Sequence, residues 1–249
     1  MKAYGGQSWA IETFADLTTQ LQGLKDEFGL HFHAYRNAPE DGGWIQDFAD
    51  GEWLREAISA AISVYSKSFG RPRYFRIGDG WISNEVVAQL EQAGVEYDLT
   101  LEPGPRGLRV VPPDRGAFPD LRQAPRVPYR PSRDDFRVPG DDSQARNLWM
   151  VPVTTTCLYH PGRWHGASPW NRTEALNLGA PSDFVLPFID RLLEQEPPLI
   201  VAVARTGDLS ATPLSRNLDY LLGHPAIERL TFETPASALE RFLLNQRVA

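Results

Sequence analysis

The chain has a single cysteine, Cys157, among its 249 residues. One cysteine forms no internal disulfide and builds no cysteine zinc cage, so any bound metal must use His, Asp or Glu. A lone thiol is compatible with a reducing compartment, and no stretch approaches the roughly 18 apolar residues of a membrane span. The N-terminus lacks a basic segment followed by an apolar one. We therefore predict a cytoplasmic protein without membrane partners.

Positive charge is also scarce, because 25 Lys and Arg residues face 32 Asp and Glu residues and leave a net charge of −7. Such a chain has no basic footprint for nucleic acid, so we expect no nucleic-acid partner and favour a small-molecule or oligosaccharide substrate that is neutral or cationic. The sequence contains no phosphate-binding glycine loop, no Gly-x-Ser-x-Gly elbow and no dinucleotide fingerprint. Those reaction classes are excluded.

Apolar residues are plentiful, at 42% of the chain with seven tryptophans, which predicts a well-formed core. A length of 249 residues suits one α/β barrel, so we expect a single domain over 1–249. Residues 102–140 carry nine of the 21 prolines and eight arginines. This composition blocks regular structure and predicts a long, stiff insertion, with Phe118, Tyr129 and Phe136 as anchors that dock it.

Helical and extended patterns alternate along the chain. Asp50 and Ser83 are suited to begin helices, and Gly94 is suited to end one. Because crossovers between strands produce parallel pairing, the alternation predicts an α/β fold, as a distorted or incomplete (β/α) barrel of about six to seven parallel strands. A short strand within residues 2–9 would add to six strand candidates. The predicted helices are 11–28, 54–65, 83–90, 182–194, 214–222 and the C-terminus, and the candidate strands are 30–35, 74–77, 95–99, 148–153, 199–204 and 230–232.

Two histidines at alternate positions, His31 and His33, are the first candidates for chemistry. On a strand they project to the same side as Tyr35, and imidazole nitrogens are good ligands for zinc or a similar divalent metal. The alternative is a hydrogen-bonded pair of histidines in a polar barrel end. Catalytic zinc takes about three protein ligands, so a further ligand would be required.

A second candidate lies at the end of the segment 74–77, where parallel barrels present reactive side chains. Asp79 in this turn is a candidate metal ligand or base, and Arg76 is suited to hold its carboxylate ionised. The alternative is a structural Arg–Asp pair that supports the turn.

The segment 159–165 is interpreted as a loop in which His160 or His165 could supply a general acid. The alternative is that both are surface bystanders. Aromatic residues could line a cleft that stacks on sugar rings, with core packing as the alternative. The candidates for substrate binding are Tyr35, Trp44, Trp81 and Trp164.

Three segments in order, 29–33, 71–81 and 90–98, resemble the polysaccharide deacetylase family. In that family a histidine motif ends one barrel strand, an arginine-bearing motif ends the next, and a Leu-acidic-small-Gly segment with Tyr-Asp follows, as in Leu90 to Asp98 here. The resemblance covers roughly residues 20–100 well and the remainder loosely. It implies a distorted seven-stranded barrel and a zinc-type ion that hydrolyses N-acetyl groups of amino sugars.

By position, His31 and His33 resemble the family's metal-binding histidines, although the family's usual pair is spaced by three residues and this one by one. Arg76 matches the arginine that orients a catalytic aspartate. No Asp-Asp pair precedes His31, and the segment 204–208 has no histidine where active members keep a general acid.

The leading hypothesis is a divergent deacetylase-like hydrolase of carbohydrate metabolism that removes an acyl group from an amino sugar or similar amide with a metal-bound water. Asp79 would complete the metal site. The alternative is a catalytically inactive barrel that binds a carbohydrate or a partner protein. Two further alternatives are an upstream strand that carries the missing acids, if Met1 is not the natural start, and a metal-dependent amidohydrolase barrel.

Overall fold

The structure is a computed structural model, and it describes residues 2–4, 27–41, 43–104, 115–160, 170–205 and 212–248. The predicted helix 11–28 lies almost wholly outside these ranges. Contacts divide the chain into two compact units, Met1–Leu101 with Arg106–Pro152, and Glu102–Pro105 with Val153–Ala249. That both units form one domain stays a prediction.

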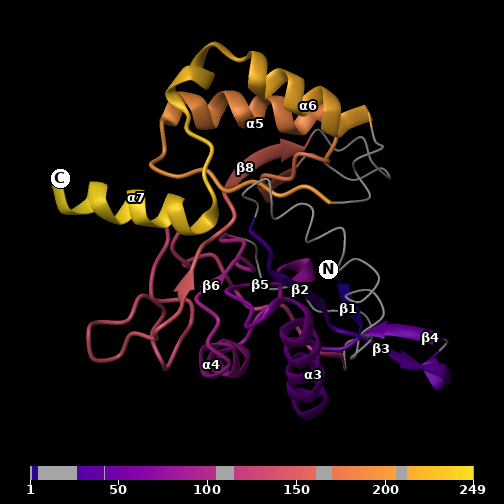
Figure 1. Ribbon diagram of the computed structural model, residues 1–249. Helices are drawn as coiled ribbons and strands as arrows, with labels where there is room; N and C mark the ends of the chain where they lie inside the picture. The colour runs from indigo at the N-terminus through magenta and orange to yellow at the C-terminus, as the bar shows by residue number, and fades with distance from the viewer. Residues whose placement is uncertain are drawn as a thin grey trace. The chain divides into compact units, whose positions relative to one another are not determined.

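The first unit is built on a sheet of five parallel strands (Figure 1). Strand β1 is the short strand expected within residues 2–9, and it pairs with β2. Each further strand adds beside the previous one, so the predicted parallel α/β class is confirmed. In sheet order the strands are β1 (Lys2–Tyr4), β2 (Leu30–His33), β5 (Tyr74–Ile77), β6 (Tyr97–Asp98) and β7 (Trp149–Met150).

Helices α3 (Gly51–Phe69) and α4 (Asn84–Gln92) provide the crossovers between β2, β5 and β6. The Asp50 side chain accepts a hydrogen bond from the Trp53 N–H and caps α3, and Ser83 caps α4 in the same way. Gly94 follows α4 with a φ of 76°, which glycine adopts without steric cost. These caps confirm the predicted helix starts and the predicted stop.

One face of the sheet forms the core of this unit. Alternate residues of β2 and β5 pack in a single cluster with apolar residues of α3 and α4. This burial is the main driving force for the unit, at about 1.5–3 kcal/mol for each large side chain removed from water. The strand members of the cluster are Leu30, Phe32, Phe75 and Ile77, and the helix members include Leu54, Ile58, Ala61, Val86, Val87 and Leu90.

An antiparallel hairpin follows β2 directly, made of β3 (Tyr35–Ala38), the short helix η1 (Pro39–Asp41) and β4 (Gly43–Gln46). The sequence predicted one continuous strand through Tyr35, which is wrong. Strand β2 ends at His33, because the carbonyl of Ala34 accepts the N–H of Asp47 at the base of the hairpin.

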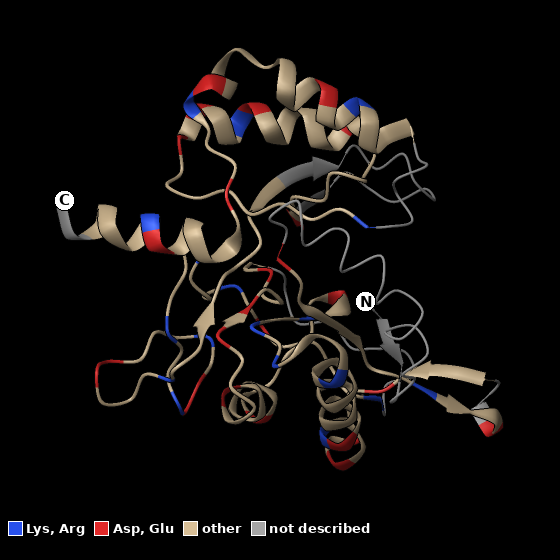
Figure 2. Ribbon diagram, viewed as in Figure 1, with Lys and Arg blue, Asp and Glu red and all other residues tan. Residues whose placement is uncertain are grey.

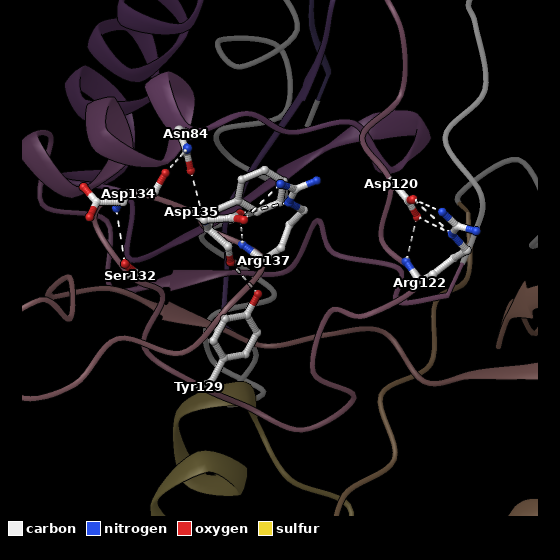
Figure 3. Close-up of polar contacts among 9 residues, drawn as sticks. Asn84, Asp120, Arg122, Tyr129, Ser132, Asp134, Asp135 and Arg137 are labelled. Atoms are coloured by element: carbon white, nitrogen blue, oxygen red, sulfur yellow. Dashed lines mark hydrogen bonds and ion pairs between the residues drawn. The ribbon is translucent and has the colours of Figure 1, made fainter.

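The proline-rich segment 115–148 has no long helix or strand and is joined by isolated bridges. Tyr129, Phe136 and Phe118 pack against the core as the sequence predicted. Side-chain bonds hold the segment to α4: Asn84 donates to the carbonyl of Asp134 and accepts the N–H of Phe136 (Figure 3). Tyr129 donates to the carbonyl of Phe136 at 2.6 Å.

The second unit contains an antiparallel hairpin and three α-helices among its described residues. Leu176, Phe188, Ile189 and Leu192 are the centre of a separate apolar cluster, to which Ala226 also belongs. The elements are β8 (Thr155–His160), β9 (Trp170–Ala175), α5 (Ser182–Gln195), α6 (Thr212–Gly223), η5 (Pro225–Arg229) and α7 (Pro235–Val248).

Three sequence predictions are wrong in the second unit. Residues 199–204 form one isolated bridge instead of a strand, and the N–H of Val201 bonds the Thr154 hydroxyl rather than a strand carbonyl. Residues 230–232 are irregular, since the N–H of Leu230 closes η5 and Phe232 is exposed. Residues 159–160, expected in a loop, end β8. No described helix has the length and apolar character needed to cross a membrane.

Candidate functional site

The carboxyl ends of β2 and β5 bring the candidate residues together. Strand β2 pairs in parallel with β5, and His31 lies in register with Arg76. Residues in register on neighbouring strands share a face, so His31, His33 and Arg76 lie on the face opposite the apolar core. This is the polar face that the alternation predicted.

The rings of His31 and His33 stack on each other. Their centroids are 4.7 Å apart and their planes are inclined by 28°. Tyr35 remains close although it belongs to β3, with its ring centroid 6.1 Å from that of His33. The prediction that these three rings lie together is therefore confirmed, although Tyr35 belongs to a separate strand and not to the continuation of β2.

The turn η2 (Gly78–Gly80) brings Asp79 against His33. The Asp79 Oδ2 atom lies 3.4 Å from His33 Nδ1 and accepts a hydrogen bond of 2.6 Å from Gln46 Nε2. Asp79 has a φ of 66°, in the left-handed region that Asp and Asn tolerate better than most residues. A Cβ atom on Gly78 would collide with the His33 ring, so this position requires glycine. The turn thus fixes a carboxylate beside an imidazole.

A second carboxyl group, Asp98, is completely buried at the end of β6. Burial raises the pKa of Asp98 to about 7, against the opposing effects of hydrogen bonds from Thr100 and the charge of Arg76. Buried carboxyl groups with raised pKa values are frequent at functional sites, though structural networks also produce them. The positive charge of Arg76 acts on Asp98 and lowers its pKa. A pair between Arg76 and Asp79 stays a prediction.

A zinc site on His31 and His33 lacks a third ligand among the described residues. An imidazole nitrogen binds an ion that lies in the ring plane at about 2.0–2.1 Å. Catalytic zinc also takes about three protein ligands. Within the described ranges, no group of three His, Cys, Asp or Glu side chains is placed to hold a metal.

The structure separates the remaining candidates. Trp81 is buried, stacks on Phe48 with centroids 4.5 Å apart and donates its indole N–H to the carbonyl of Ala117, which is the core-packing alternative. Trp44 is 54% exposed on β4. For His160 the structure describes only the backbone, which ends β8. His165 and Trp164 lie outside the described residues.

No family model, curated protein or solved structure matches this chain. The assignment of a function therefore depends on the geometry of the site.

Sequence reasoning did not identify Gln46 as a site residue and did not assign a role to Asp98. Gln46 reaches Asp79 across 33 positions of the chain, and no local pattern signals that contact. Asp98 stands next to Tyr97 at the end of β6, and Thr100 follows two positions later. A carboxylate with a hydroxyl at this spacing after a strand was the available signal.

Proposed function

We propose that this chain is a divergent hydrolase of the polysaccharide deacetylase kind, in which His33 and Asp79 form an acid–base pair. The reaction is the removal of an acyl group from an amino sugar or a similar amide. The observation that carries the proposal is the 3.4 Å contact between Asp79 Oδ2 and His33 Nδ1 at the carboxyl edge of the parallel sheet. Parallel α/β folds carry their active sites at this edge.

The contact allows a defined division of labour. Asp79, held by Gln46, orients the His33 ring through Nδ1, so that Nε2 exchanges the proton. In the reaction His33 takes a proton from water as the water oxygen bonds to the acyl carbon. It then gives the proton to the amine nitrogen as the C–N bond breaks. Arg76, on the face of His31, is suited to stabilise the negative charge on the acyl oxygen.

The order of the strands supports a barrel. In a doubly wound sheet the order reverses at a switch point, whereas in a (β/α) barrel each strand is added beside the last. The order β1-β2-β5-β6-β7 advances in one direction. Closure into a barrel of six to seven strands is part of this proposal, as is a cytoplasmic location.

The zinc ion that the resemblance implies also stays a prediction. None of the steps above uses it, because no group of three metal-ligating side chains lies among the described residues. His160 and His165 are likewise retained only as alternative sources of the proton for the amine.

The proposal is tested by acetate release from N-acetylglucosamine oligomers, with the zinc content of the same sample measured by elemental analysis. We expect turnover by the wild-type protein and a loss of at least about 100-fold in His33→Ala, the range of acid–base contributions. The matched control is His224→Ala, because His224 Nε2 also lies near a carboxylate, 3.6 Å from Asp190 Oδ1, but in the second unit. Wild-type protein that releases no acetate would remove the proposal.

The second candidate is a catalytically inactive barrel that binds a carbohydrate or a partner protein. The absence of an Asp-Asp pair before His31 in the sequence favours it. It predicts saturable thermal stabilisation by amino-sugar oligomers without acetate release.

A further inference from the structure

Gln46 is the last residue of β4 and lies in register with Tyr35, the first residue of β3. Directly opposed residues of an antiparallel pair share a face, so both side chains project from the same face of the hairpin. The Tyr35 ring lies 6.1 Å from the His33 ring, and Gln46 Nε2 donates to Asp79 Oδ2 at 2.6 Å. This face of the hairpin therefore reaches the acid–base pair.

The contact between Gln46 and Asp79 has one chemically allowed direction. An ionised carboxylate accepts hydrogen bonds and donates none, so the amide of Gln46 must present its NH2 group. The oxygen that it bonds, Asp79 Oδ2, is the same oxygen that lies 3.4 Å from His33 Nδ1. A carboxylate oxygen has two lone pairs, so one oxygen serves both nitrogens. Gln46 thus fixes the oxygen that faces the imidazole.

The two members of the acid–base pair differ in their contact with water. The Asp79 side chain is 34% exposed, whereas the His33 side chain is 13% exposed. A carboxylate that is one-third exposed can turn toward water, and such a rotation carries Oδ2 away from the ring. A charge-assisted hydrogen bond opposes the rotation. The bond from Gln46 therefore keeps the carboxylate turned toward His33.

The opposite face of the hairpin holds Gln46 in place. The next residue, Asp47, is buried, and its N–H donates to the carbonyl of Ala34 at 2.9 Å. Its carboxylate pairs with Arg36 at 2.7 Å and with Arg115 at 3.4 Å. Arg36 is the one charged residue of β3, and β4 carries none (Figure 2). Because a buried ion pair with several hydrogen bonds has a defined geometry, the backbone at Gln46 is anchored.

We propose that Gln46 is a positioning residue that sets the tautomer of His33 by holding Asp79 Oδ2 against Nδ1. Which nitrogen of a neutral imidazole carries the proton is set by the hydrogen bond that the other atoms of the ring can make. A carboxylate oxygen at Nδ1 favours the proton on Nδ1, and Nε2 is then the acceptor that the reaction needs. This inference rests on the proposed function and adds that the hairpin controls the reactive nitrogen.

The first measurement is the 15N NMR spectrum of the imidazoles in the full chain, which distinguishes the two neutral tautomers without substrate. At about pH 8.5, where an ordinary imidazole is neutral, we expect wild-type His33 to be the Nδ1–H tautomer. In Gln46→Leu the ratio of the Nε2–H to the Nδ1–H form should rise at least about tenfold, the scale of a hydrogen bond to a charged group. The signal that is missing in His33→Ala identifies His33.

Gln89→Leu is the matched control for this spectrum. Gln89 Nε2 also donates two hydrogen bonds in the first unit, to the carbonyl of Arg55 and to the hydroxyl of Ser59, but it contacts neither member of the acid–base pair. We expect the tautomer of His33 to be the same in Gln89→Leu as in the wild-type protein. A general loosening of the unit by a lost glutamine would instead change the spectrum in both variants.

The second measurement is the pH profile of acetate release by Gln46→Glu, which has nearly the shape of the wild-type side chain. A Glu carboxyl group donates to Asp79 only when it is protonated, and once ionised it repels the carboxylate. We expect the activity of Gln46→Glu relative to wild type to fall at least about tenfold between about pH 5 and pH 8. Gln46→Leu adds no titratable group, so its activity should keep a constant ratio to that of wild type.

A wild-type His33 in the Nε2–H form, or an unchanged tautomer in Gln46→Leu, overturns the inference. A profile of Gln46→Glu that runs parallel to that of wild type does the same. The outcome is separable from that of the proposed function. A tautomer that depends on Gln46 without acetate release by the wild-type protein supports the inference and removes the hydrolase. Acetate release that is unaffected by Gln46→Leu removes the inference and leaves the hydrolase standing.

Discussion

Thr100 holds both oxygens of the buried Asp98 carboxyl group. Its backbone N–H donates to Oδ1 at 3.0 Å, and its hydroxyl donates to Oδ2 at 2.9 Å. The same hydroxyl accepts the N–H of Ile77 at 2.8 Å. Asp98 is thereby tied to the end of β5, directly before the turn that carries Asp79.

Asp98 makes stability depend on pH between about pH 4 and pH 7. Because burial raises its pKa from 3.8 to about 7, the folded protein binds its proton more tightly than the unfolded chain does. Between about pH 4 and pH 7 the folded state holds more protons, so this contribution to stability is present below pH 4 and is lost as pH rises through 7. At about 1.4 kcal/mol per pKa unit, the loss is on the order of 4 kcal/mol.

The neutral variant Asp98→Asn removes this titration and retains an oxygen for the Thr100 N–H. We expect the free energy of unfolding in urea to change less between pH 5 and pH 8.5 for this variant than for the wild-type protein. Relative to the wild type, the variant should be more stable at the higher pH. The exposed carboxylate of Asp142 offers a control, since Asp142→Asn should keep the wild-type slope. If the unfolding free energy of Asp98→Asn had the same slope against pH as that of the wild type, Asp98 would not be the group that causes the pH dependence.

The contact between Gly78 and His33 predicts a severe effect of one methyl group. In Gly78→Ala the Cβ collides with the His33 ring, so we expect destabilisation of about 1–3 kcal/mol and loss of acetate release. Gly51→Ala is the control, because a Cβ there meets no atom within 4 Å at the start of α3, and a gain of about 0.4–1 kcal/mol is expected. Thermal unfolding measures both. A Gly78→Ala protein as stable and active as Gly51→Ala would rule out the packing described.

Glu91 fixes the proline-rich segment to α4. Its carboxylate accepts hydrogen bonds from the Arg146 guanidinium at 2.9 Å and from the Asn147 N–H at 2.7 Å. Burial alone would raise its pKa, but these two bonds and the charge of Arg133 outweigh that effect and lower it. The resulting contribution to stability is present above the ordinary pKa of 4.5 and is lost as pH falls through the lowered folded-state value.

We therefore expect Glu91→Gln to lower the free energy of unfolding by about 2–3 kcal/mol at pH 7, because Arg146 is left buried without its partner. Glu96→Gln is the comparison, since it breaks the more exposed pair with Arg73 and should cost less than about 1 kcal/mol. Denaturant titration at pH 7 gives both values. Equal costs would show that the docking of this segment does not depend on Glu91.

The elements that the sequence predicted well are those with local signals. Strand β5 and helices α3 and α4 have apolar periodicity and their own caps at Asp50 and Ser83, so neighbouring residues specify them. The β3–β4 hairpin was missed because its two four-residue strands show no regular alternation of polar and apolar residues, although Asp41-Gly42 between them is typical of a hairpin turn. Its stability comes from Arg36 and the buried Asp47, a contact made in tertiary structure.

The site was predictable in part for the same reason. His31 and His33 lie on one strand that the pattern reveals and Asp79 follows the next, and their grouping follows from the parallel register. The orientation of the His33 ring was not predictable, since the ring lies against Gly78, a contact made in tertiary structure. Gln46 was missed because its bond to Asp79 exists only once the hairpin has folded over the edge of the sheet.

The proposed reaction requires His33 and Asp79 to act as one unit, and a double-mutant cycle tests this directly. Acetate release is measured for His33→Ala, Asp79→Asn and the double variant; Asn is chosen because it tolerates the left-handed backbone of position 79. If the two residues are one acid–base pair, the double variant loses no more activity than His33→Ala alone. Losses that multiply independently would show that the two side chains act separately and would contradict the account.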